Sequence, residues 1–206
     1  MTAPRRVGRP RDVDSAETRA RLLTEARRHF AQYGYAGTTN RALADAAGLT
    51  TGAIYHYYPS QIDLYVAVYA EVQEVIFERF EKATASRSGY VERLHAILDA
   101  GVQLSREDTS IGGFVMSAAA DIGRHPELAA ALGPVRARSA QFLHRTIAEA
   151  KAAGELHASV DAAALEDLLV SVLNGLALFV NTTGDADRHA AAVDVLKLTI
   201  SATMRR

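Results

Sequence analysis

Cysteine is absent from this 206-residue chain. Without thiols there is no disulfide framework, no thiolate metal site and no cysteine nucleophile, and the sequence predicts a cytoplasmic location. No segment approaches the 18 unbroken apolar residues of a membrane-spanning helix. In a secretory signal an apolar segment follows the basic N-terminus, and no such segment follows it here. We therefore expect a globular protein without a membrane span, with one sizeable core or two small ones.

The common catalytic motifs are missing as well. The chain has no GxSxG nucleophile elbow, no P-loop, no HExxH zinc motif and no dinucleotide-binding fingerprint, so we expect neither an enzyme nor a cofactor. Asp121 and His125 are four residues apart and share a helix face if that segment is helical. Without a third ligand they indicate a local pair near a helix end and not a metal site.

Charge is unevenly distributed along the chain. Residues 1–60 hold nine arginines and no lysine against five acids, a net charge of +4, whereas the remaining residues carry −5. A basic head on an acidic body indicates a polyanionic partner at one end only. The alternative is that the arginine-rich segment is merely solvated and has no such partner.

The alternation of apolar and polar residues that is typical of strands is nearly absent. The residues at the ends of the apolar segments are instead typical of helix starts and stops. Asp14 and Glu17 form a capping-box pattern, and helical apolar spacing then continues to a stop at Gly34. A second helix is predicted over Asn40–Ala47 with a threonine as its cap, and a third from about Thr50 to Tyr57. Ser60 begins a fourth helix with an apolar stripe. The fold class is therefore all-α.

The spacing of Ala44, Gly48 and Ile54 predicts a helix-turn-helix. Two short helices cross closely only if a small residue lies at the crossing and the turn tolerates a positive φ. Ile54 would then fill the crossing. The second helix of such a motif lies in the DNA major groove, so Thr50, Thr51, Tyr55, His56 and Tyr57 remain for phosphates and base edges. Gly52 lets the backbone approach DNA, while Tyr58 is expected to pack in the core.

The segment from Arg21 to Leu64, "RLLTEARRHFAQYGYAGTTNRALADAAGLTTGAIYHYYPSQIDL", resembles the TetR-type transcriptional regulators, and "TTNRALADAAGLTTGAIYHYYPS" carries the most specific part. The resemblance implies an all-helical homodimer of about nine helices per subunit, in which a fourth helix joins a three-helix DNA-binding head to a ligand-binding body. It also implies which residues touch DNA. These are Thr38, Arg41, Thr50, Gly52, Tyr55, His56 and Tyr57.

Two positions depart from the pattern of that family. Thr51 and Gln61 stand where lysine is usual, and each change removes a cation that pairs with phosphate. The basic N-terminal segment offers a replacement, because Arg9 and Arg11 flank a proline that keeps the chain extended. Such an arm enters a narrow minor groove, where the negative potential favours arginine. A leader with no role beyond general attraction is the alternative.

Beyond residue 85 helices are predicted at about 90–105, 111–123, 126–153, 161–183 and 186–204. The last two are apolar over wide faces, and a helix of that kind needs a second partner. A four-helix bundle made by two subunits would supply it, with Gly175 allowing a close crossing. Ordinary burial within one subunit is the alternative.

The predicted body helices also carry residues that could line a ligand pocket. The candidates to line it are Phe114, Met116, Phe142, Ile147 and Phe179, with Asn174 or His95 as polar contacts. Each of them also fits plain core.

The sequence thus predicts a basic arm over residues 1–14, a helix-turn-helix domain over 15–60 and a ligand-binding and dimerisation domain over 61–206. The resemblance implies a homodimeric repressor that binds a (pseudo)palindromic double-stranded DNA operator and is released by a small, largely apolar effector. A ligand-independent DNA-architectural or helical interaction protein is the alternative.

Overall fold

The structure is a computed structural model that describes the backbone of residues 11–204 and the side chains of residues 15–202. Within that range the chain forms helices and no strands, as the sequence predicts. The helices are α1 (Arg11–Gly37), α2 (Asn40–Ala47), α3 (Thr51–Tyr57), α4 (Gln61–Thr84), α5 (Tyr90–Glu107), α6 (Thr109–Arg124), α7 (Pro126–Ala152), α8 (Ala162–Thr183) and α9 (Ala186–Met204).

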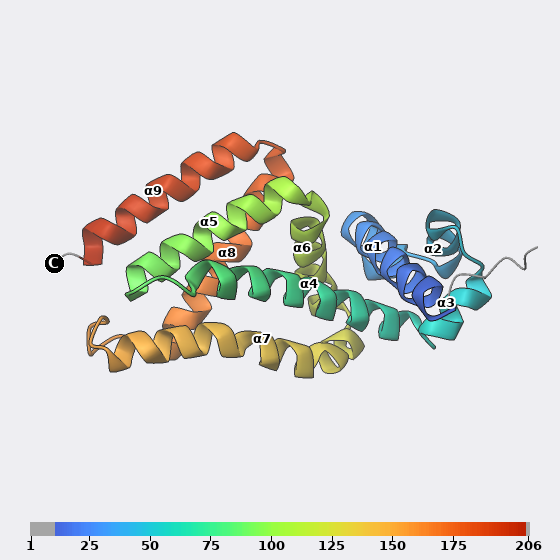
Figure 1. Cartoon of the computed structure of the whole chain (residues 1–206), viewed down its shortest axis with the longest axis horizontal. Coiled ribbons are helices and arrows are strands. Elements are labelled where there is room, and N and C mark those ends of the chain that lie inside the picture. The colour runs from blue at the N-terminus through green and yellow to red at the C-terminus, as the bar shows by residue number, and fades with distance from the viewer. Residues whose placement is uncertain (1–10, 205–206) are drawn as a thin grey trace, which may run out of the picture.

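The first three helices form a head at one end of the molecule, and α4 leads from this head along the body (Figure 1). In the body, α9 lies along α5 at one edge and α7 lies along α4 at the other. Helix α6 packs on α1 and also on α8, so it lies between the head and the rest of the body.

Helix α1 begins at Arg11, earlier than the predicted cap at Asp14. Its regular part ends where predicted, because Gly34 adopts a φ of 70°. An L-residue rarely adopts that conformation. Space is restricted as well, since a Cβ at Gly34 would lie 3.1 Å from Oδ1 of Asp121. The glycine therefore both turns the chain and allows α6 to approach.

The core runs continuously from the head into the body. One cluster of buried side chains includes Leu22, Leu43 and Ile54 of the head together with Phe114 and Leu132 of the body. The division after residue 60 is therefore a change in helix arrangement and not a gap in the core.

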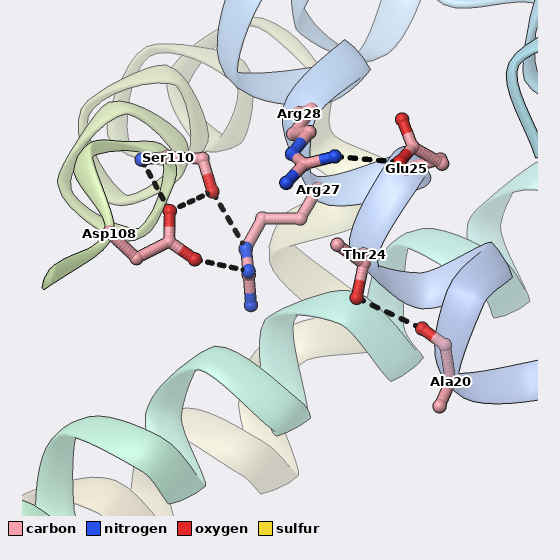
Figure 2. A network of polar contacts seen from close by, with 7 residues as sticks. All are labelled: Ala20, Thr24, Glu25, Arg27, Arg28, Asp108 and Ser110. Carbon is pink, nitrogen blue, oxygen red and sulfur yellow. Dashed lines mark hydrogen bonds and ion pairs between the residues drawn. The ribbon is translucent and has the colours of Figure 1, made fainter. Parts of the chain in front are cut away.

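An ion pair also joins the head to the body. Arg27 of α1 is 7% exposed, and its Nη2 lies 2.5 Å from Oδ2 of Asp108, the N-cap of α6. Its Nε donates to the hydroxyl of Ser110 at 3.0 Å, and Ser110 in turn bonds Asp108 (Figure 2). Burial acts to raise the pKa of Asp108, but the hydrogen bonds from Ser110 and the charge of Arg27 outweigh it, so that the pKa lies below its ordinary value.

Candidate nucleic-acid interface and internal cavity

The crossing of α2 and α3 has the geometry that the sequence predicts. Ala44 is buried, Gly48 takes the left-handed conformation with a φ of 64°, and Ile54 is 1% exposed. The hydroxyl of Thr39 caps α2 by accepting from Ala42 N, and the hydroxyl of Thr50 caps α3 in the same way. These caps fix where α3 begins, and burial of Ile54 fixes which of its faces points outward.

The outward face of α3 carries five of the residues predicted to touch DNA. Thr50, Thr51, Gly52 and His56 are exposed, and 51% of Tyr55 is exposed. Arg41 on α2 is also exposed, and it has no ion-pair partner among the side chains of residues 15–202. An exposed guanidinium and a row of hydroxyl, phenol and imidazole groups can all contact phosphate oxygens or base edges.

Two predicted residues, Thr38 and Tyr57, lie differently. Thr38 is buried, and its hydroxyl donates to the carbonyl of Gly34 at 2.8 Å, so its side chain supports the turn after α1. Tyr57 is half-buried, and its hydroxyl lies 3.4 Å from that of Ser15 on α1. Only the backbone of Arg11 is described, at the start of α1, and Arg9 lies outside the described residues. Tyr58, in contrast, is buried as predicted.

Gln61 has a role that the sequence did not reveal. Its amide donates to the carbonyls of Tyr35 at 2.8 Å and Thr38 at 2.7 Å. It therefore ties the first residue of α4 to the connection between α1 and α2. Where the family pattern offers a cation for phosphate, this chain uses the position to join the head to the helix that leads into the body.

A cavity of about 590 Å³ lies within the body, in the range of small-molecule sites. Its walls come from α4 to α8, with His189 from α9. Arg136, Ala140, Asp167 and Val170 line it and are solvent-exposed, so the cavity reaches the surface between α7 and α8. The apolar lining consists of Ile76, Phe77, Phe80, Leu98, Leu104, Ile111, Val115, Ala118, Ile122, Leu143, Leu173, Leu176, Ala177 and Val180.

Of the residues predicted to line a ligand pocket, Asn174 alone lines this cavity. Phe114 is fully buried against Phe30 and Tyr65, and the ring of Phe142 lies 5.6 Å from that of Phe77. These two aromatic side chains face neighbouring helices and therefore form core behind the cavity walls.

Met116 and Phe179 are also outside the cavity. Met116 lines a separate recess between α1, α6 and the end of α8, and Phe179 lies under the guanidinium of Arg188 at 5.4 Å. The two further candidates are structural: Ile147 is buried in a cluster with Tyr90, and Nε2 of His95 lies 3.2 Å from the carbonyl oxygen of Lys197.

Asp121 and His125 do not pair with each other through their side chains. The carboxylate of Asp121 accepts from Tyr35 N and the Tyr65 hydroxyl, while His125 lies 3.2 Å from Glu127. No group of three or more metal-ligating side chains occurs in the part of the chain that the structure describes.

Comparison with known proteins identifies the chain. Residues 22–68 match the family model of the bacterial regulatory proteins of the TetR family, and residues 91–196 match that of the tetracyclin repressor-like C-terminal domain. The HTH-type transcriptional repressor Rv1474c of Mycobacterium tuberculosis is 28% identical over 88% of this chain and 92% of its own length.

Solved structures agree. Salmonella enterica GusR has a TM-score of 0.75 at 25% identity, and the match covers 98% of this chain and 100% of the GusR chain. The FadR regulator of Bacillus subtilis, solved in complex with stearoyl-CoA, has a TM-score of 0.73 at 16% identity, covering 86% of this chain and 96% of its own. The chain therefore belongs to the TetR family of bacterial regulatory proteins, and it is a DNA-binding transcriptional regulator rather than an enzyme.

Proposed function

We propose that this protein is a ligand-responsive repressor that works in the cytoplasm. It binds a (pseudo)palindromic operator as a homodimer and is released when a small, largely apolar effector enters the body cavity. The observation that carries the proposal is that α4 and α6 each form a wall of the cavity and also contact the head. A molecule in the cavity therefore touches the same helices that position the recognition helix.

The cavity favours an effector over a ligand-independent architectural role. It has the size of small-molecule sites, and most of the side chains that line it are apolar, which suits a largely apolar ligand. The Bacillus subtilis FadR regulator, which has the same fold, was solved with stearoyl-CoA. That precedent supports a small molecule in the body of this protein as well.

Helix α8 supports the homodimer. By length and composition it would pass as a membrane span, yet only 6% of its most apolar window is buried in the protomer. The exposed apolar side chains of α8 and α9 include Leu168, Leu178, Val195 and Leu198. In a chain of this family the covering partner that we propose is α8 and α9 of a second copy. At Gly175 a Cβ would meet nothing within the protomer, which leaves room for a close crossing.

Release follows from the geometry of a dimer on DNA. Two recognition helices fit successive major-groove faces only when they lie about one helical turn apart, roughly 34–36 Å. An effector that displaces α4 or α6 changes this separation. It shifts the equilibrium only if it binds the released conformation more tightly than the DNA-bound one. The basic arm with Arg9 and Arg11 would add minor-groove contacts outside the recognition helices.

Selection of bound fragments from random DNA tests the proposal. The expected outcome is a single (pseudo)palindromic sequence, with two half-sites whose centres lie about 10–10.5 base pairs, or a multiple of that, apart. The purified protein should then be released from that sequence by an effector and not by an equal concentration of salt. Binding without sequence preference would instead support the architectural alternative.

A further inference from the structure

The cavity has two chemically different ends along α4. Tyr69 and Gln73 line one end, and Phe77 and Phe80 line the other. Tyr69 and Phe80 are eleven residues apart, which corresponds to about 16 Å along a helix axis. Helix α7 runs beside α4 in the same direction (Figure 1), and the ring of Phe142, six residues after Arg136, lies 6.2 Å from that of Phe80. Arg136 therefore belongs to the end with Tyr69 and Gln73.

This polar end holds hydrogen-bond donors that have no acceptor in the described part of the chain. The Arg136 guanidinium, the Tyr69 hydroxyl and the Gln73 amide have no hydrogen-bond or ion-pair partner among the described side chains of residues 15–202. Burial raises the pKa of Tyr69, and the nearby charge of Arg136 opposes this only in part, so the hydroxyl stays protonated and able to donate. A guanidinium beside a phenol is well suited to bind a carboxylate or another oxyanion.

Acidic residues also line the cavity, but they do not neutralise Arg136. Glu166 lies 3.5 Å from Nδ1 of His144, at the other end of the cavity. His144 is eight residues after Arg136 on α7, about 12 Å along the axis. Asp167 is solvent-exposed, and neither acid forms an ion pair with Arg136. The positive end therefore keeps its charge available for a ligand.

We propose that the cavity binds an amphipathic anion. The oxyanion, a carboxylate in the simplest case, lies between Arg136, Tyr69 and Gln73, and an aliphatic or aromatic body extends along α4 towards Phe77 and Phe80. The regulatory meaning of this site rests on the proposed function. Because Tyr69 and Gln73 are on the helix that leads to the head, drawing them towards an anion moves the helix that positions α3.

Calorimetric titration of the full chain without DNA tests the site directly. The probes are dodecanoate, dodecanol and dodecyltrimethylammonium, which share one alkyl chain and differ in head-group charge. Dodecanoate should bind more tightly than dodecanol by about tenfold or more, because a charge-assisted hydrogen bond is stronger than a neutral one. Equal affinities, a preference for the cation or no binding of dodecanoate would overturn the proposal.

Variants assign the head group to its residues. Arg136→Gln should weaken dodecanoate binding by about tenfold to a hundredfold and leave dodecanol binding unchanged. Tyr69→Phe should produce a smaller loss of the same selectivity. The matched control is Arg138→Gln, on the same helix, exposed and not part of the cavity lining, which should bind dodecanoate like the wild type. Equal losses in Arg136→Gln and Arg138→Gln would overturn the assignment.

Operator binding separates this inference from the proposed function. A chain that binds dodecanoate through Arg136 but selects no operator retains the anion site and refutes the repressor. A chain that selects an operator but does not distinguish the three probes remains a repressor and refutes the amphipathic anion.

Discussion

The carboxylate of Asp121 on α6 accepts a hydrogen bond at 2.9 Å from the backbone N–H of Tyr35, the residue after the turn of α1 at Gly34. The same oxygen accepts from the Tyr65 hydroxyl of α4 at 3.1 Å and from Ser117 at 3.3 Å. One buried side chain thus holds together the head, the connecting helix α4 and a wall of the cavity. Because Ala118 and Ile122, on either side of Asp121 in sequence, line the cavity, a ligand there lies close to this junction.

Removing this junction should destabilise the protein. Asp121→Ala leaves the Tyr35 N–H and the Tyr65 hydroxyl without an acceptor, and we expect a loss of about 2–4 kcal/mol in the free energy of unfolding. Urea denaturation measures it. Asp121→Asn, which keeps one acceptor oxygen, should lose less, and exposed Asp45→Ala on α2 should lose almost nothing. An unfolding free energy of Asp121→Ala equal to that of the wild type would contradict the role of the junction.

Loss of the outward side chains of the recognition helix should lower DNA affinity and leave the stability of the protein unchanged. His56→Ala and Tyr55→Ala each remove an exposed side chain, and losing one direct contact costs about 1–3 kcal/mol of operator binding. Their thermal unfolding should match the wild type. Tyr57→Ala is expected to lower both DNA affinity and stability, because Tyr57 packs against the core. Undiminished operator affinity in both the His56 and Tyr55 variants would remove α3 from the interface.

The basic N-terminal segment should contribute to DNA binding without affecting the fold. Deleting residues 1–10 removes Arg5, Arg6 and Arg9 and leaves α1, which begins at Arg11. Each phosphate contact that is lost should reduce the magnitude of the log–log salt slope of operator binding by about 0.9. If Arg9 enters the minor groove, the preference for A·T flanks should fall as well. A slope and a flank preference like those of the full chain would show that the segment does not contribute to operator binding.

Buried His189 should make stability depend on pH. It lines the cavity with Nδ1 3.3 Å from the Ser105 hydroxyl, and burial, together with the charge of Arg106, lowers its pKa below the ordinary value. The unfolded chain therefore binds a proton at a higher pH than the folded chain does. Stability should fall as the pH drops through the unfolded value of about 6.5.

Melting temperatures from about pH 7.5 to about pH 5.5 test this linkage. His189→Gln should show a smaller decrease over this interval than the wild type, since the glutamine takes up no proton. His157→Gln, in the exposed connection between α7 and α8, should decrease like the wild type. Parallel curves for His189→Gln and the wild type would exclude a contribution from His189.

Local chemistry explains which features could be predicted from the sequence. Caps such as Thr39 and Ser60, and glycines at left-handed positions such as Gly48, depend on a few neighbouring residues. Because the same local signals act throughout the chain, the boundaries of α5 to α9 agree with prediction to within two residues. The crossing at Ile54 likewise depends on residue type and spacing alone.

The cavity could not be predicted in the same way. Whether an apolar residue lines a cavity or fills the core depends on which neighbours it meets from distant helices, and Phe114 and Phe142 meet other aromatic rings. Tyr69 and Gln73 lie one helical turn apart, but the anion site that we propose forms only together with Arg136 on another helix. The same holds for Gln61, whose partners are two backbone carbonyls of the head.

The exposed faces of α8 and α9 give the most direct test of assembly. Leu198 is 71% exposed and Leu168 57%, so a glutamate at either position remains in water in a single protomer and costs little. In a dimer built on these helices the same charge would be buried without a partner, at a cost of several kcal/mol. Gly175→Arg adds a charge at the expected close crossing. Leu176→Glu is less specific, because Leu176 also lines the cavity.

We therefore expect the wild type to sediment at twice its chain mass of 22.2 kDa, and Leu198→Glu, Leu168→Glu and Gly175→Arg to sediment as monomers or to aggregate. Operator binding should fail in each of them although α3 is unchanged, because one head makes only half of the contacts. Arg87→Glu, exposed between α4 and α5, controls for added negative charge and should remain dimeric. A wild type that sediments as a monomer at micromolar concentration while binding its operator tightly would refute the dimer.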